Sequence, residues 1–358
     1  MRPRGGESLL TRRDFLTLGT AVVASAVTGL GAASLLPLPR AGASAPTPLP
    51  VPAPTPSPAA AAPSPAAAAP MAAVPPAKPV TVALLSDPHT QATYSDVARL
   101  VNPKLVKALT DLQPLTPDLW LVNGDLAEDG VQAQYAAFKE ITGKVVPPGK
   151  LLVTTGNHDF YDFKVSDADS LRRFREMFGL PQVYSSRVVS GVHLVTLADE
   201  ARKNAPDSGH PDWAWLSPEQ LHWFEQVLAE NRQRFTAVFL HQPLQNTVAA
   251  SVGANPMGGS GQAKELRAIL AKNPQAKLWF SGHTHRRIDA DGQVVHDGGT
   301  AFVALGSTAY LAGAGGGKDY SASQSRVLEI YPDRVVVRAR DHTAGQWLDH
   351  LQVTLPLV

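Results

Sequence analysis

The chain has 358 residues, enough for one large domain or two ordinary ones, and its hydrophobic content of 44% is typical of a globular protein. A formal net charge of +1 argues against nucleic acid as a partner held by charge. The absence of cysteine excludes disulfides, thiolate zinc sites and a cysteine nucleophile, so any metal must be held by His, Asp, Glu or Asn.

Residues 1–43 resemble a bacterial twin-arginine export signal. Arg12-Arg13 precedes a weakly apolar stretch that extends to about Leu38, and small residues at 41–43 offer a cleavage site. The alternatives are an ordinary N-terminal helix or a retained membrane anchor, because the apolar stretch is nearly long enough to span a bilayer. The signal predicts an exported protein, located in the periplasm, in the cell envelope or outside the cell. Its expected partner is the twin-arginine translocation machinery, with membrane attachment only through an uncleaved signal.

Residues 44–79 consist almost entirely of Pro, Ala, Ser and Thr. Proline removes backbone donors and favours extended conformations, and alanine offers little surface to bury. We therefore expect a disordered linker, followed by a single domain at residues 80–358. We expect this domain to be a monomer.

Short apolar runs alternate with amphipathic segments from Val80 onward. The apolar runs predict strands at 80–85, 119–122, 151–155, 192–197, 237–240, 278–280 and 302–305. The amphipathic segments predict helices at 97–112, 131–142, 168–178, 218–231 and 263–272, the fourth with Ser217 as N-cap and Pro218 at its first position. The alternation indicates a layered α/β domain. Segments 326–330, 334–340 and 347–354 predict a C-terminal antiparallel β meander.

Five of the predicted strands end in a cluster of His, Asp or Asn. The clusters are SDPHT (Asp87, His89), NGDLAEDG (Asp125), TTGNHDF (Asn157, His158), LHQPL (His241) and SGHTHRR (His283, His285). Ligands bind beyond the carboxyl ends of strands in α/β folds, so these side chains are expected to meet at one edge of the sheet. Carboxylate, amide and imidazole ligands suit Mn, Fe or Zn. The candidate ligands are the two aspartates, the asparagine and four of the imidazoles (His89, His241, His283 and His285). These seven are too many for one ion, which predicts two divalent metal ions sharing one carboxylate.

The ordered series DPH, GD, GNHD, a lone His and GHTH closely resembles the motifs of the calcineurin-like metallophosphoesterases, over about residues 80–287. The resemblance implies a four-layer α/β/β/α sandwich of the metallo-dependent phosphatase type, with the β-rich tail completing the second sheet. It also implies a hydrolase that cleaves phosphomonoester or phosphodiester bonds with metal-activated water.

The resemblance further implies a role for each motif residue. One metal is expected on Asp87, His89, Asp125 and His285, and the second on Asp125, Asn157, His241 and His283. His158 is expected to hydrogen-bond the phosphate and protonate the leaving oxygen, with Glu128 orienting it. Gly156 is expected to let the backbone turn sharply at the strand end.

The sequence departs from some branches of that family. Asp129 stands where protein phosphatases carry a phosphate-gripping arginine, and the tyrosine of purple acid phosphatases is absent. The motifs are closer to bacterial phosphodiesterase-like members, including cyclic-nucleotide phosphodiesterases. Arg286 and Arg287 are candidates for the missing phosphate contact, with ordinary surface arginines as the alternative. Segment 251–262 is either a lid or a linker, and loop 205–215 is a candidate wall of the substrate cleft.

Two further possibilities are weaker. The stretch AGAGGGKDY at 312–320 lacks the spacing of a phosphate-binding loop and predicts a flexible loop. A function from another class is a non-catalytic, metal-stabilised binding protein of the cell envelope. Such a protein would be expected to lose the acid or a ligand. All eight motif positions are filled here, which favours the enzyme.

Overall fold

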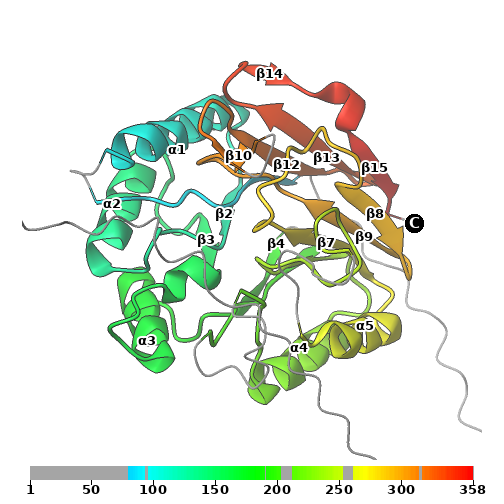
Figure 1. The fold of residues 1–358 in the computed structure, drawn as a ribbon. Coiled ribbons are helices and arrows are strands. Elements are labelled where there is room, and N and C mark those ends of the chain that lie inside the picture. Colours follow the sequence, from blue (N-terminus) through cyan, green and yellow to red (C-terminus); the bar gives the residue numbers. More distant parts are fainter. Residues whose placement is uncertain are drawn as a thin grey trace, which may run out of the picture. The chain divides into compact units, whose positions relative to one another are not determined.

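The computed structural model describes residues 80–92, 96–189, 191–202, 212–252, 261–313 and 317–357. The predicted signal and linker lie outside the described residues, so their boundaries stay predictions. Most of segment 251–262 and much of loop 205–215 also lie outside them. Two β-sheets face each other in the described part, and helices cover their outer faces (Figure 1).

The first sheet has seven strands in the order β14-β13-β12-β1-β2-β3, with β15 also paired to β13. Their bounds are β1 Val80–Leu85, β2 Leu119–Asn123, β3 Leu151–Thr154, β12 Gln324–Ile330, β13 Arg334–Asp341, β14 Gln346–Trp347 and β15 Val353–Pro356. Strands β1, β2 and β3 run parallel, so their carboxyl ends reach the same edge.

The second sheet has six strands in the order β4-β5-β6-β7-β9-β8. Their bounds are β4 Ser185–Val189, β5 Val192–Thr196, β6 Thr236–Phe239, β7 Ala276–Ser281, β8 Val294–Asp297 and β9 Thr300–Ala304. Strands β5, β6, β7 and β9 are parallel. A separate hairpin pairs β10 (Leu311–Ala312) with β11 (Lys318–Asp319).

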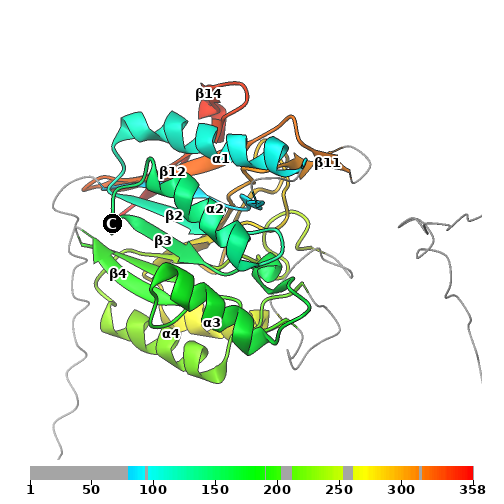
Figure 2. The same cartoon turned by 90° about the vertical axis from the view of Figure 1, so that its left-hand side faces the viewer.

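Helices α1 (Ala98–Leu112), α2 (Gln132–Gly143) and α3 (Asp167–Phe178) pack on the outer face of the first sheet (Figure 2). Helices α4 (Pro218–Glu230) and α5 (Ala263–Lys272) pack on the second. Apolar side chains such as Leu84, Phe239 and Leu328 fill the space between the sheets. Short 3₁₀ segments occupy Gln113–Leu115, Asn157–Phe160 and Asp349–Leu351. The predicted four-layer sandwich is confirmed.

Most of the predicted elements appear within one or two residues of their expected bounds. The side chain of Ser217 accepts the N–H of Gln220, as expected of the α4 N-cap. Strand β4 was not predicted, because it is only partly buried and lacks an apolar run.

The expectation that the tail completes the second sheet is wrong, because β12 pairs antiparallel with β1 of the first sheet. The alternation along β12 explains this, since Leu328 faces the space between the sheets while Val327 packs toward α1. In the part of the chain that the structure describes, no helix has the length and apolar character needed to cross a membrane.

Candidate metal centre

All seven predicted ligands lie directly beyond strand ends. Strands β1, β2 and β3 of the first sheet lead to Asp87, His89, Asp125 and Asn157, and strands β6 and β7 of the second lead to His241, His283 and His285. The ligand loops therefore come from two sheets, rather than from one edge of a single sheet. The site lies where the carboxyl ends of both parallel sets meet.

Asn123, the last residue of β2, connects the two sheets beneath the site. Its Nδ2 donates to the carbonyl of Leu240 at 3.2 Å, and its own carbonyl accepts from His241 Nδ1 at 2.6 Å. The same carbonyl accepts from the hydroxyl of Ser86 at 2.8 Å. Asn123 is fully buried, so these hydrogen bonds hold three motif loops in fixed relative positions.

Five of the seven candidate ligands have left-handed backbone conformations. Their φ angles are +53° at Asp87, +44° at His89, +49° at Asp125, +66° at His283 and +50° at His285. This conformation costs on the order of 1–3 kcal/mol at a non-glycine residue and persists only where the surroundings enforce it. It turns each loop back at the strand end, which directs the side chains toward the centre.

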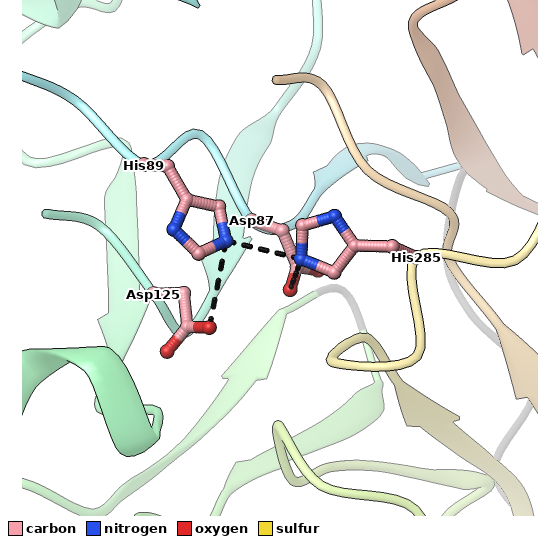
Figure 3. A group of neighbouring side chains, drawn as sticks. All are labelled: Asp87, His89, Asp125 and His285. Carbon is pink, nitrogen blue, oxygen red and sulfur yellow. Dashed lines mark hydrogen bonds and ion pairs between the residues drawn. The ribbon is translucent and has the colours of Figure 1, made fainter. Parts of the chain in front are cut away.

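Four candidate ligands form the first cluster (Figure 3). His89 Nε2 lies 3.0 Å from His285 Nε2 and 3.6 Å from Asp125 Oδ2. His285 Nε2 also lies 3.0 Å from Asp87 Oδ1. One donor atom from each of the four residues lies within 4.8 Å of the others, a spacing that a single ion can bridge.

A second cluster shares Asp125 with the first. It comprises Asp125, His241 and His283, with His241 Nε2 3.2 Å from Asp125 Oδ2. Asn157 completes it, because its Oδ1 lies 2.9 Å from His283 Nδ1. The amide nitrogen of Asn157 faces the hydroxyl of Tyr161 at 3.0 Å, which turns the oxygen toward the cluster. The structure thus brings together the two predicted ligand sets, which meet at the predicted shared carboxylate.

The hydrogen bonds of the imidazoles favour a bound cation. His285 Nδ1 faces the carbonyl of Tyr310 at 2.9 Å, and His89 Nδ1 lies 2.9 Å from Glu128 Oε2. These acceptors favour the tautomer with the proton on Nδ1, in which each neutral ring presents its Nε2 lone pair to the other across 3.0 Å. Two lone pairs at this distance repel each other unless a positive ion lies between them. His241 Nε2 is buried and faces two carboxylates, Asp125 Oδ2 at 3.2 Å and Asp87 Oδ1 at 3.7 Å. The residues fit a divalent metal.

The carboxylates give this centre a strong preference for positive charge. Burial would raise the pKa of Asp125, but His241 and His158 hold it well below its ordinary value. Burial would lower the pKa of His241, but Asp125 and Asp87 outweigh it and raise that pKa to about 10. Burial lowers the pKa of His89 and of His283 to about 4, so both candidate ligands are neutral imidazoles at pH 7.

His158 lies beside the metal clusters. Its Nδ1 donates to the backbone carbonyl of Glu128 at 2.7 Å, and its ring stacks on Tyr161 with centroids 4.0 Å apart. The expectation that the carboxylate of Glu128 orients His158 is wrong, because that carboxylate lies at His89 Nδ1 instead. Glu128 acts on His158 through its main chain, and its side chain orients a candidate ligand. His89, Glu128 and His158 also form a third group able to hold an ion.

Comparison with known proteins identifies the family. Residues 80–287 match the calcineurin-like phosphoesterase family, and this match covers more than half of the chain. The chain belongs to that family.

Curated relatives of this phosphoesterase include several diesterases. A probable cyclic nucleotide phosphodiesterase of Synechococcus is 25% identical over 59% of this chain and 75% of its own length. A 3',5'-cyclic adenosine monophosphate phosphodiesterase of Escherichia coli is 29% identical, over 49% of this chain and 56% of its own length. Purple acid phosphatase 21 of Arabidopsis thaliana is 26% identical, over 50% of this chain and 40% of its own length.

Solved structures share the phosphoesterase fold. A dimetal phosphatase from Danio rerio superposes with a TM-score of 0.56 at 14% identity, covering 78% of this chain and 99% of its own. A purple acid phosphatase from yellow lupin gives 0.53 at 16% identity, covering 78% of this chain and 54% of its own. The protein is a metal-dependent phosphoesterase with a binuclear divalent metal site, and the non-catalytic alternative is set aside.

A cavity of about 300 Å³ opens over the metal centre of this phosphoesterase. Its described lining includes candidate ligands and His158, together with residues to which the sequence analysis gave no site role: Tyr161, Asp212, Thr284, Tyr310, Ala312, Gly317 and Lys318. Asp212 comes from the loop expected to form a cleft wall. Neither Arg286, which is exposed, nor Arg287, which pairs with Asp289, is among the lining residues. Tyr161 lies three residues beyond His158, so its nearness to that motif could have indicated it. Nothing in the local sequence marked the other residues as part of a site.

Gly156 is required for space rather than for a sharp turn. Its φ of −124° is available to any residue, which corrects the expectation from sequence. A Cβ at this position would collide with Asp125 Oδ1 and would lie 2.6 Å from His241 Cδ2. Glycine therefore lets the β3 loop approach the shared carboxylate closely.

We expect Gly156→Ala to lower both metal content and activity. The added methyl group displaces Asp125, and a misplacement of about 1 Å near reacting groups can cost roughly a hundredfold in rate. Metal analysis and phosphoester hydrolysis measure the effect. Gly143→Ala is the matched control, because no atom lies within 4 Å of the Cβ it would add. Equal metal content and rate in the two variants would contradict this account.

Proposed function

We propose that this phosphoesterase hydrolyses phosphodiesters, with cyclic nucleotides as the first substrate class to test. The charge of the cavity carries this proposal. Lys318, 3.6 Å from Glu128 Oε1, is the one Lys or Arg side chain among its described lining residues, and Asp212, 3.4 Å from Arg202 Nη2, adds a carboxylate to the wall. A diester carries one negative charge, whereas a monoester dianion places a second charge near that carboxylate. The curated phosphodiesterases among the relatives support the same preference.

The side chains have distinct proposed roles in the reaction. The bound metal pair supplies activated water and neutralises charge on the phosphoryl oxygens. Asp87, His89 and His285 are proposed to hold one ion, and Asn157, His241 and His283 the other, with Asp125 shared between them. His158 is proposed to act as an imidazolium that gives its Nε2 proton to the leaving oxygen and becomes a neutral imidazole, while its Nδ1–H stays on the carbonyl of Glu128; the residue lines the cavity.

A hydrolysis panel tests the substrate class. Purified protein with added Mn(II) is assayed on bis-p-nitrophenyl phosphate, p-nitrophenyl phosphate and 3',5'-cyclic nucleotides. We expect kcat/KM on the diesters to exceed that on the monoester. The reverse order would reject the diesterase assignment while leaving the phosphoesterase family intact.

We further propose that residues 1–43 export the folded protein by the twin-arginine pathway, to the periplasm, the cell envelope or the medium. The Arg12-Arg13 pair and the weakly apolar stretch after it support this. Cell fractionation tests it: an Arg12→Lys/Arg13→Lys double variant should stay in the cytoplasm, and Arg4→Lys should be exported normally. Equal export of both variants would reject the pathway.

A further inference from the structure

The hairpin β10–β11 borders the metal cavity, although its sequence predicted only a flexible loop. Ala312, Gly317 and Lys318 of this hairpin line the cavity. The N–H of Ala312 donates to the carbonyl of the candidate ligand His285 at 2.7 Å, which ties the hairpin to the metal centre. In Figure 2, β11 lies beside the first turns of α1.

Contacts with α1 hold the base of the hairpin in place. Lys104 of α1 donates to the carbonyls of Ala309 and Ala322 at 2.9 and 3.0 Å, on either side of the hairpin. Val101 of α1 packs against Tyr310. The segment is therefore anchored to a helix and not merely a loop over the surface.

Lys318 projects from this hairpin over the centre. Its Nζ lies 4.3 Å from the centroid of the Tyr310 ring, and that ring stacks on the His285 imidazole with centroids 4.2 Å apart. Its nearest recorded ion-pair partner is Glu128 Oε1 at 3.6 Å, beyond hydrogen-bond length. The Lys318 ammonium group has three N–H donors, and the side chain is 44% exposed. It can therefore donate hydrogen bonds to an anion that enters from solvent.

A cationic side chain in this cavity would favour the binding of an anionic phosphoester. Asp125 and Asp212 both line it, so an anionic phosphoester entering it meets carboxylates as well as the metal centre. Neither Arg286 nor Arg287 lines the cavity. Lys318 is the remaining lysine or arginine among the described lining residues.

We propose that Lys318 Nζ binds the phosphoryl oxygens of the substrate. The proposal rests on the proposed function as a phosphoesterase acting at this cavity. A point charge on a lysine stem binds phosphate without the fixed fork of an arginine, which suits diesters with substituents of different shape. Lys318 would thereby be a substrate-binding residue outside the five polar clusters that follow the strands.

Binding of inorganic phosphate to the metal-loaded protein tests the proposal without requiring turnover. Isothermal titration calorimetry on Lys318→Met should show roughly tenfold weaker phosphate binding, the usual effect of losing one charged hydrogen bond. Lys318→Arg should stay within about threefold of the wild type, since it keeps the charge. Metal content should be unchanged in both variants. Arg286→Met is the matched control and should bind phosphate as the wild type does.

The kinetic counterpart is a rise in KM for the Met variant with a smaller change in kcat, because the contact exists before the transition state is reached.

Unchanged phosphate affinity in Lys318→Met would overturn the proposal. So would a loss of metal in that variant, because Lys318 would then act through Glu128 on His89. A loss of phosphate binding in Arg286→Met would assign the contact to Arg286 instead. If the wild type bound phosphate but hydrolysed no diester, the proposed substrate class would be rejected. The comparison of phosphate affinities would still test the role of Lys318.

Discussion

Asp125→Asn is expected to reduce the bound metal to less than two equivalents and to lower phosphoester hydrolysis by about a thousandfold or more. A bound metal contributes several kcal/mol to stabilisation of the transition state, and each 1.36 kcal/mol is a factor of ten in rate. Asp125 Oδ1 accepts the N–H of His158 at 2.9 Å, while Oδ2 lies 3.2 Å from His241 Nε2. An amide keeps the first contact but replaces the second oxygen with an N–H₂ group, which has no lone pair for a metal.

Elemental analysis of the purified protein and single-substrate kinetics measure these two effects. Asp129→Asn is the matched control, because this carboxylate is exposed and bonds Gln134 Nε2 at 2.8 Å outside both clusters. The control should keep its metal and rate. If Asp125→Asn also retained two equivalents of metal and near-normal activity, Asp125 would not be the shared ligand.

His158→Ala should keep its metal and lose about a hundredfold to ten-thousandfold in rate on substrates with alkoxide leaving groups. The loss should be smaller on p-nitrophenyl esters, because a stable leaving oxygen needs less protonation. His158 is placed for this role by its bond to the carbonyl of Glu128 and by its stacking on Tyr161, and it lines the cavity.

The same variant distinguishes an acid from a ligand, since His158 also belongs to a group with His89 and Glu128 that is able to hold an ion. Loss of metal from His158→Ala would make it a ligand. An equal rate loss on both kinds of leaving group would also exclude the acid role. His296→Ala is the control, because His296 is an exposed histidine on β8, and it should behave as the wild type does.

The candidate ligands were accessible from sequence because each follows its strand directly. An apolar run marks a buried strand, and the polar residue after it must lie near the strand's carboxyl end. Asp87 and Asp125 are examples, two residues beyond β1 and two beyond β2. Local order along the chain therefore located these side chains in three dimensions.

Atom-level roles were less accessible. Sequence placed Glu128 near His158, but only the structure separates its carbonyl, which contacts His158, from its carboxylate, which contacts His89. Gly156 looked like a turn residue, whereas its neighbours Asp125 and His241 require the space that a side chain would fill. Both distinctions depend on distances between loops that are separated in the chain.

The sequence by itself determined the order of the buried strands and of the helices, the residues beyond the strand ends and the kind of metal chemistry they can support. These follow from local patterns of burial and from the donor atoms of each side chain. Only the tertiary structure decided that the ligands come from two sheets, that the tail extends the first sheet, and that Lys318 reaches the cavity. The physical reason is that these depend on packing between distant segments, such as Lys104 of α1 holding the chain on either side of the β10–β11 hairpin. No local pattern encodes such contacts.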